Sequence, residues 1–156
     1  FCPTEALAKL ESLAAAGVHS IEQPIAPRQE KDLAELCRRS PLPIALDEEL
    51  IAHANLPELR ERMLDRIRPH AIVIKPSLHG GLLAAEHWAQ AADDRGITWW
   101  VNSALESNIG RTTLAEWCAY RAPEKLQGLG TGTLFTDDAE GPLYARGNCI
   151  FYSAPQ

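Results

Sequence analysis

The sequence lacks the features that mark several large classes of protein. No segment gathers Lys and Arg into a basic stripe, and the net charge is −6, so the electrostatic footprint of a nucleic-acid-binding protein is missing. No apolar run approaches the roughly 20 residues that a membrane-spanning helix needs. The first residues show no charged segment followed by an apolar run, so no signal peptide is predicted. We therefore expect a globular, cytoplasmic protein that binds neither nucleic acid nor membrane.

Paired cysteines are also absent. The four cysteines are widely scattered, and they form no Cys-x-x-Cys pair and no metal-ligand spacing. We interpret them as free, buried or half-buried thiols of a protein in a reducing compartment. These cysteines are Cys2, Cys37, Cys118 and Cys149.

Five short apolar runs are typical of β-strands. The first four are rich in Ile, Val and Trp, and they are nearly continuous in apolar residues, which indicates parallel strands covered on both faces. The predicted strands are Val18–Glu22, Leu42–Asp47, Ala71–Lys75, Thr98–Ser103 and a weaker Leu126–Thr131.

Amphipathic stretches precede and separate these strands. The predicted helices are Pro3–Ala16, Gln29–Arg39, Leu56–Ile67, Leu82–Asp94 and Arg111–Tyr120. The polar residues that end the strands are 25, 28, 28 and 28 positions apart, a regularity that favours a (β/α) barrel over an open sheet. Eight such units need about 200–250 residues. We therefore predict an α/β fold, a partial TIM-type barrel of about five C-terminal βα units.

Three strands end in side chains suited to chemistry. Glu22, Asp47 and Lys75 would project into one mouth, because the active sites of (β/α) barrels lie at the C-terminal ends of the strands. Two neighbouring carboxylates repel each other, and a divalent cation relieves that repulsion. Oxygen ligands favour Mg²⁺ or Mn²⁺ over zinc. Lys75 would act as a cation or as a base. Taken singly, each residue also fits a helix cap or a surface turn.

Longer strings around these residues carry a family resemblance. SIEQPI, PIALDEEL and IVIKPSLHGG resemble the enolase superfamily, and more narrowly its muconate-lactonizing-type subgroup. The resemblance implies that Glu22 and Asp47 are Mg²⁺ ligands at the fourth and fifth strands of the barrel. It also implies that Glu48 is the acidic neighbour that supports the site, and that Lys75 is the catalytic lysine of the sixth strand.

Two later motifs narrow the resemblance. WWVNSALESNIG and GLGTGTLF are similar to the seventh- and eighth-strand signatures of o-succinylbenzoate synthases. These enzymes dehydrate a cyclohexadiene carboxylate in menaquinone synthesis, so a small-molecule carboxylate is the implied substrate. We assign substrate binding to Ser103, Gly130, Thr131 and Gly132, although a tight strand-to-helix turn explains these residues equally well.

The departures from the family pattern matter too. The family's Lys-x-Lys pair and its third-strand Asp ligand have no counterpart among these 156 residues. We therefore interpret residues 1–156 as the C-terminal part of the catalytic barrel, without the capping domain and the first strands, and expect the chain alone to be inactive. Two alternatives stay open for function: an N-acylamino acid racemase or dipeptide epimerase of the same superfamily, and a non-catalytic truncated domain. The oligomeric state is not predicted.

Overall fold

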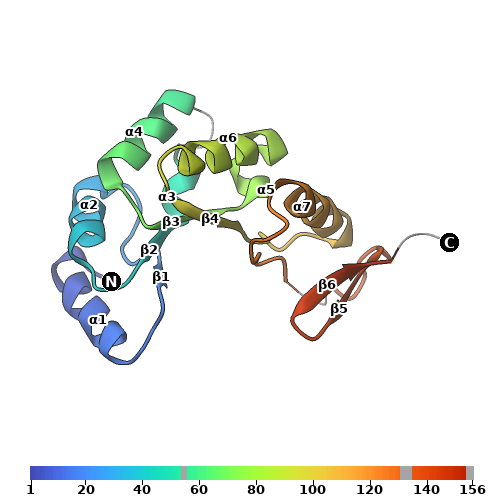
Figure 1. Cartoon of the computed structure of the whole chain (residues 1–156), viewed down its shortest axis with the longest axis horizontal. Coiled ribbons are helices and arrows are strands. Elements are labelled where there is room, and N and C mark those ends of the chain that lie inside the picture. The colour runs from blue at the N-terminus through green and yellow to red at the C-terminus, as the bar shows by residue number, and fades with distance from the viewer. Residues whose placement is uncertain (54–55, 131–134, 154–156) are drawn as a thin grey trace. The chain divides into compact units, whose positions relative to one another are not determined.

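The computed structural model describes residues 1–53, 56–130 and 135–153. The chain divides into two compact units, Phe1–Trp99 and Trp100–Gln156 (Figure 1). Each unit is considered by itself below.

The first unit alternates helices with short strands. The strand order of the sheet is β1-β2-β3-β4, in which β1 and β2, and β2 and β3, pair in parallel, and β4 continues past the end of this unit at Trp99 (Figure 1). Glu22 is in register with Ala45, and Leu46 is in register with Ile72. The strands are β1 (Ile21–Glu22), β2 (Ile44–Leu46), β3 (Ala71–Ile74) and β4 (Thr98–Val101). The helices are α1 (Pro3–Ala15), α2 (Glu30–Arg39), α3 (Glu48–Ile51), α4 (Pro57–Ile67), α5 (Pro76–His79) and α6 (Gly81–Asp93).

The core of this unit lies between the sheet and its long helices. Every residue of β2 and β3 is buried, as a parallel strand covered on both faces requires. Helix α2 packs on α4, α4 packs on α6, and α6 packs on β3. Leu33, Met63, Leu64 and Trp88 are almost completely buried in these contacts. The first four predicted strands and the first four predicted helices all form, with boundaries that differ by one to three residues.

Two short helices were not predicted. Each of them follows a strand that ends at a candidate site residue. Helix α3 begins one residue after Asp47, and α5 begins one residue after Lys75. Pro76 fits the first position of α5, where its missing N–H costs no hydrogen bond. Gly80 has φ +95° between α5 and α6, a backbone conformation that favours glycine. A single helical turn is too short for a periodic pattern, so apolar spacing could not reveal it.

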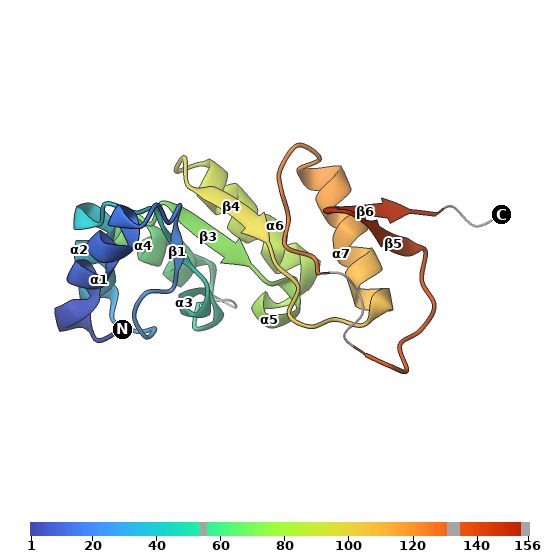
Figure 2. The ribbon, with the colours of Figure 1, turned by 90° about the horizontal axis from the view of Figure 1, so that it is seen from below.

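The second unit contains one long helix and a hairpin. Helix α7 (Asn108–Arg121) was predicted, whereas the antiparallel pair β5 (Leu143–Arg146) and β6 (Cys149–Tyr152) was not (Figure 2). The predicted strand over Leu126–Thr131 is wrong where the structure describes it, because only an isolated parallel bridge joins Asn102 and Gly128. The Gln127 side chain accepts the Val101 N–H at 2.7 Å, in the place of a backbone partner.

The cysteines are free thiols, as predicted, but only two are buried. Cys37 and Cys118 are buried, and burial raises the pKa of each thiol to about 12, whereas Cys2 and Cys149 are exposed. Among the described residues, no helix has the length and apolar character needed to cross a membrane.

Candidate active site

The structure brings Asp47 and Lys75 into direct contact at the ends of neighbouring strands. Lys75 Nζ donates to Asp47 Oδ2 and forms an ion pair with it. The Asp47 side chain is 3% exposed and the Lys75 side chain 19% exposed. Burial alone would lower the pKa of Lys75, but the hydrogen bond and the charge of Asp47 outweigh burial and raise that pKa. Lys75 is therefore a firmly protonated cation while it holds Asp47.

Glu22 reaches the same pair from β1. The pKa of its carboxyl is raised to about 7, first by desolvation, and then by the hydrogen bond and the negative charge of Asp47, while Lys75 acts in the opposite sense. Glu22 as a whole residue is exposed. Its carboxyl nevertheless responds to the charges of both Asp47 and Lys75. Two carboxylates this close need either a shared proton or a cation.

The unpaired oxygen of Asp47 fits a metal ligand. While Lys75 holds Oδ2, Oδ1 is buried and has no hydrogen-bond partner among the described residues. A buried, unsatisfied carboxylate oxygen is costly unless a donor or a cation approaches it. Glu22 and Asp47 together offer the oxygen donors that a hard divalent cation prefers. Both carboxylates belong to the first unit.

Glu48 acts on this site through its charge. The residue opens α3 with an exposed side chain. Its negative charge contributes to raising the pKa of Glu22 and that of Lys75. A carboxylate at this position also suits the N-terminus of a helix, where the dipole favours negative charge.

Gln23 organises the backbone around the site, and sequence reasoning missed it. Its Oε1 accepts the backbone N–H of Asp47 at 3.1 Å and that of Glu49 at 3.3 Å. Its Nε2 donates to the Ile25 carbonyl at 3.0 Å. Gln23 itself adopts φ +40°, a left-handed conformation that is unfavourable for a side-chain-bearing residue. These hydrogen bonds hold the ends of β1 and β2 at the spacing the site needs.

His79, which the sequence pattern did not single out, contacts the backbone of the site lysine. The residue is fully buried, and its Nδ1 accepts the Lys75 N–H at 3.2 Å. Burial is the main cause that lowers the pKa of His79 to about 4; the charge of Asp47 opposes this shift and that of Lys75 contributes to it. The ring is therefore neutral near pH 7, with its proton on Nε2. The spacing of four residues from Lys75 is the only sequence signal that could have pointed to it.

Ser103 and Gly130 belong to the second unit. Ser103 Oγ donates to Glu106 Oε2 and accepts the Leu105 N–H at 3.2 Å, so it is engaged in its own turn. Gly130 is exposed and has φ +69°, which suits a turn. Thr131 and Gly132 lie outside the described residues. The substrate-binding assignment of these four residues stays a prediction.

Comparison with known proteins decides the family. The enolase C-terminal domain-like family matches residues 1–146. The chain belongs to that family. The o-succinylbenzoate synthase of Desulfotalea psychrophila (strain LSv54 / DSM 12343) is 47% identical to this enolase C-terminal domain over 150 residues, which cover 96% of the chain and 40% of that relative. The chain thus spans about 40% of the length of this curated relative.

Solved structures agree with this membership. The crystal structure of MenC from Desulfotalea psychrophila LSv54 matches with a TM-score of 0.91 at 47% identity, over 96% of this chain and 42% of that chain. The L-Ala-D/L-Glu epimerase from Bacillus subtilis, in a substrate-liganded complex, matches with a TM-score of 0.84 over the same shares. Its identity is 23%, so this second likeness concerns the fold. The predicted α/β barrel portion and the enolase resemblance are confirmed. Enolase-superfamily enzymes use a divalent metal ion.

Removing the side chain of Gln23 is expected to destabilise this enolase C-terminal domain. Gln23→Ala deprives two backbone N–H groups of their acceptor, which costs roughly 1–3 kcal/mol of unfolding free energy for buried donors. Denaturant unfolding measures the loss. Gln90→Ala is the matched control, because Gln90 is exposed and its Nε2 donates to the exposed Asp94. Equal stability of the two variants would contradict the role given to Gln23.

Proposed function

We propose that the complete protein containing this chain is a Mg²⁺-dependent o-succinylbenzoate synthase, which dehydrates a cyclohexadiene carboxylate. The observation that carries the proposal is the 47% identity to the Desulfotalea psychrophila o-succinylbenzoate synthase over 96% of the chain. The contact of Asp47 with Lys75, with Glu22 beside them, supports it at the level of chemistry.

In this proposal Glu22 and Asp47 hold the metal ion. Mg²⁺, or Mn²⁺ in its place, would supply positive charge that offsets the negative charge developing on a carboxylate substrate after proton removal. The buried, unpaired Oδ1 of Asp47 supports a role as ligand. Glu22 must lose its proton to serve as the second ligand, and its pKa of about 7 sets where that happens. Glu48 keeps the surroundings negative.

Lys75 has the catalytic role. It is the cationic side chain that pairs with Asp47 at the strand ends, and its raised pKa favours an ammonium that stabilises negative charge over a free amine that removes protons. None of the lysines in this sequence forms a Lys-x-Lys pair, so no second lysine is assigned here as the base. For the same reason we propose that residues 1–156 alone do not catalyse the dehydration. Ser103, Gly130, Thr131 and Gly132 are proposed to bind the distal part of the substrate.

A direct assay tests the proposed activity. The purified complete protein is incubated with the cyclohexadiene carboxylate, with Mg²⁺ and with a chelator, and formation of the aromatic product is followed by absorbance. Mg²⁺-dependent aromatisation supports the dehydratase. A racemase or epimerase would instead exchange deuterium from solvent into N-acylamino acids or dipeptides. Exchange without aromatisation would replace the proposal with that activity. If neither aromatisation nor exchange is observed, the non-catalytic alternative remains.

Mg²⁺ binding is expected to weaken as the pH falls below about 7, where Glu22 takes up its proton. A protonated carboxyl binds a cation poorly, so each proton must be displaced before the metal binds. Calorimetric Mg²⁺ titrations between pH 6 and pH 8 measure the change, and roughly tenfold weaker binding per pH unit is the limiting slope for one displaced proton. Glu22→Gln should remove the pH dependence along with most of the affinity. A wild-type affinity that is flat over this range would contradict the ligand role of Glu22.

A further inference from the structure

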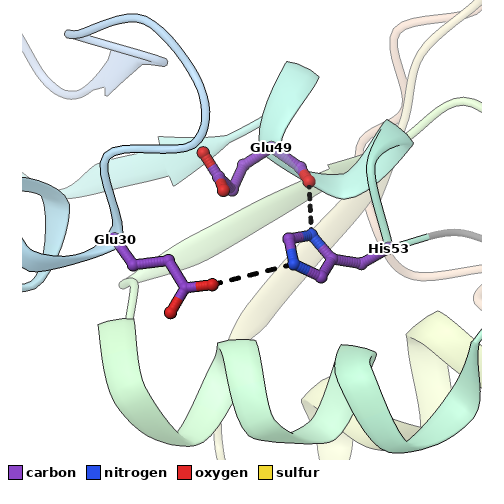
Figure 3. Close-up of side chains that lie close together, drawn as sticks. All are labelled: Glu30, Glu49 and His53. Carbon is purple, nitrogen blue, oxygen red and sulfur yellow. Dashed lines mark hydrogen bonds and ion pairs between the residues drawn. The ribbon is translucent and has the colours of Figure 1, made fainter.

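A second cluster of metal-binding side chains lies away from the strand-end residues of the first unit. Glu30 opens α2, Glu49 lies in α3, and His53 follows α3, so residues 23 positions apart in sequence face one another (Figure 3). One ligand atom of each residue lies within 4.8 Å of the ligand atoms of the other two. The three residues line a cavity of about 690 Å³.

Glu49 supplies the observation that points to a ligand. The residue is completely buried. Its Oε2 accepts the Arg28 N–H at 2.8 Å, while its Oε1 is buried and has no hydrogen-bond partner among the described residues. Figure 3 shows this side chain close to those of Glu30 and His53. A buried carboxylate oxygen without a donor is stabilised by a cation placed against it.

His53 is oriented as metal-binding histidines are. Its Nδ1 lies 2.9 Å from the Glu49 carbonyl oxygen, and because a carbonyl only accepts, Nδ1 carries the proton (Figure 3). A neutral His53 therefore presents the lone pair of Nε2. Ligating histidines commonly donate their other ring N–H to a backbone carbonyl in this way.

The lone pair of His53 faces another acceptor. Nε2 lies 3.8 Å from Glu30 Oε1, which is too long for a hydrogen bond (Figure 3). Two ligands about 2.1 Å from one ion lie roughly 3–4 Å apart, so this separation suits a bridging cation. Arg66 occupies the other oxygen, Oε2, at 3.2 Å and leaves Oε1 available. Each glutamate thus has Oε2 engaged, while Oε1 of Glu30 faces His53 and Oε1 of Glu49 has no hydrogen-bond partner among the described residues.

We propose that Glu30, Glu49 and His53 form a second divalent-metal site, selective for a zinc-class ion over Mg²⁺. A nitrogen donor with two carboxylates suits Zn²⁺ or Co²⁺, whereas Mg²⁺ prefers oxygen donors alone. The Glu30 side chain is 31% exposed, so it can move the fraction of an ångström that closes the ligand set. Water from the open cavity completes the coordination.

The bound ion would stabilise the turn that carries Asp47. The backbone N–H groups of Glu49 and Asp47 share Gln23 Oε1 as their acceptor. An ion that fixes Glu49 to the start of α2 therefore also restrains the segment after β2. The site is structural in this role, and it does not depend on the reaction that the complete protein catalyses.

Zinc titration of the complete protein, saturated with Mg²⁺, tests the proposal. We expect one additional Zn²⁺ per chain, together with a rise in melting temperature. His53→Gln and Glu49→Gln should each weaken zinc binding by at least about tenfold, as loss of a ligand does. His87→Gln is the matched control, because His87 is exposed on α6 and should bind zinc no differently. Asp47→Asn removes a ligand of the strand-end site and should leave the additional zinc in place.

Three results would overturn the proposal. The first is no additional zinc, and the second is zinc binding unchanged by His53→Gln. The third is zinc that is lost in Asp47→Asn and kept in His53→Gln, which would assign the ion to the strand ends. Zinc-soaked crystals of the unaltered protein keep the test independent of variant folding. An anomalous peak bonded to His53 Nε2 and both glutamates supports the site, and its absence there argues against it.

Discussion

Lys75→Met is expected to lower the turnover of the complete protein by about 10²–10³-fold, the usual cost of removing one group that stabilises developing negative charge. The same change should leave Mg²⁺ binding intact or strengthen it. Lys75 Nζ holds Asp47 Oδ2, so the lysine competes with the ion for this carboxylate. Steady-state kinetics and Mg²⁺ calorimetry on the same preparation measure the two effects.

Two further variants separate this role from a structural one. Asp47→Asn should abolish both Mg²⁺ binding at the strand ends and turnover, because it removes a ligand as well as the partner of Lys75. Lys9→Met is the matched control, since Lys9 is exposed on α1 and should leave both properties unchanged. If Lys75→Met lost Mg²⁺ affinity in step with turnover, Lys75 would be holding the site together and the catalytic assignment would be wrong.

His79→Asn is expected to make the protein less sensitive to acid. In the unfolded chain this histidine takes up its proton near pH 6.5. In the folded protein burial lowers its pKa to about 4; the charge of Asp47 opposes this shift and that of Lys75 contributes to it. The stabilisation is thus complete above pH 6.5 and is lost as the pH falls toward 4. A shift of this size corresponds to roughly 3 kcal/mol of unfolding free energy. Asparagine does not titrate, and its Oδ1 can accept the Lys75 N–H in place of Nδ1.

Denaturant unfolding at several pH values between 4 and 7 measures this effect. As the pH falls, the unfolding free energy of the wild type should decrease more than that of His79→Asn. His87→Asn removes an exposed histidine of α6 and serves as the control, with the pH dependence of the wild type. Parallel curves for wild type and His79→Asn would show that folded His79 titrates like an exposed histidine.

The strand-end chemistry could be predicted because each residue is marked by its local sequence. Glu22, Asp47 and Lys75 each close or follow a short apolar run, and parallel strands bring such positions to one edge. The same reasoning failed at Leu126–Thr131. There only Leu126 and Leu129 are apolar, among glycines and polar residues, and the structure forms only a bridge at Gly128 in the described part. A run of residues predicts a strand reliably only where both faces are packed.

The sequence by itself determined the family, the repeating strand and helix units, and the three side chains at the strand ends. Tertiary structure alone decided which partners these side chains meet. It paired Lys75 with Asp47, left Asp47 Oδ1 without a donor among the described residues, and brought His79 Nδ1 to the backbone N–H of Lys75. It also gathered Glu30, Glu49 and His53 around one space. Local propensity acts over a few residues, whereas these contacts join segments whose approach is set by the packing of the core.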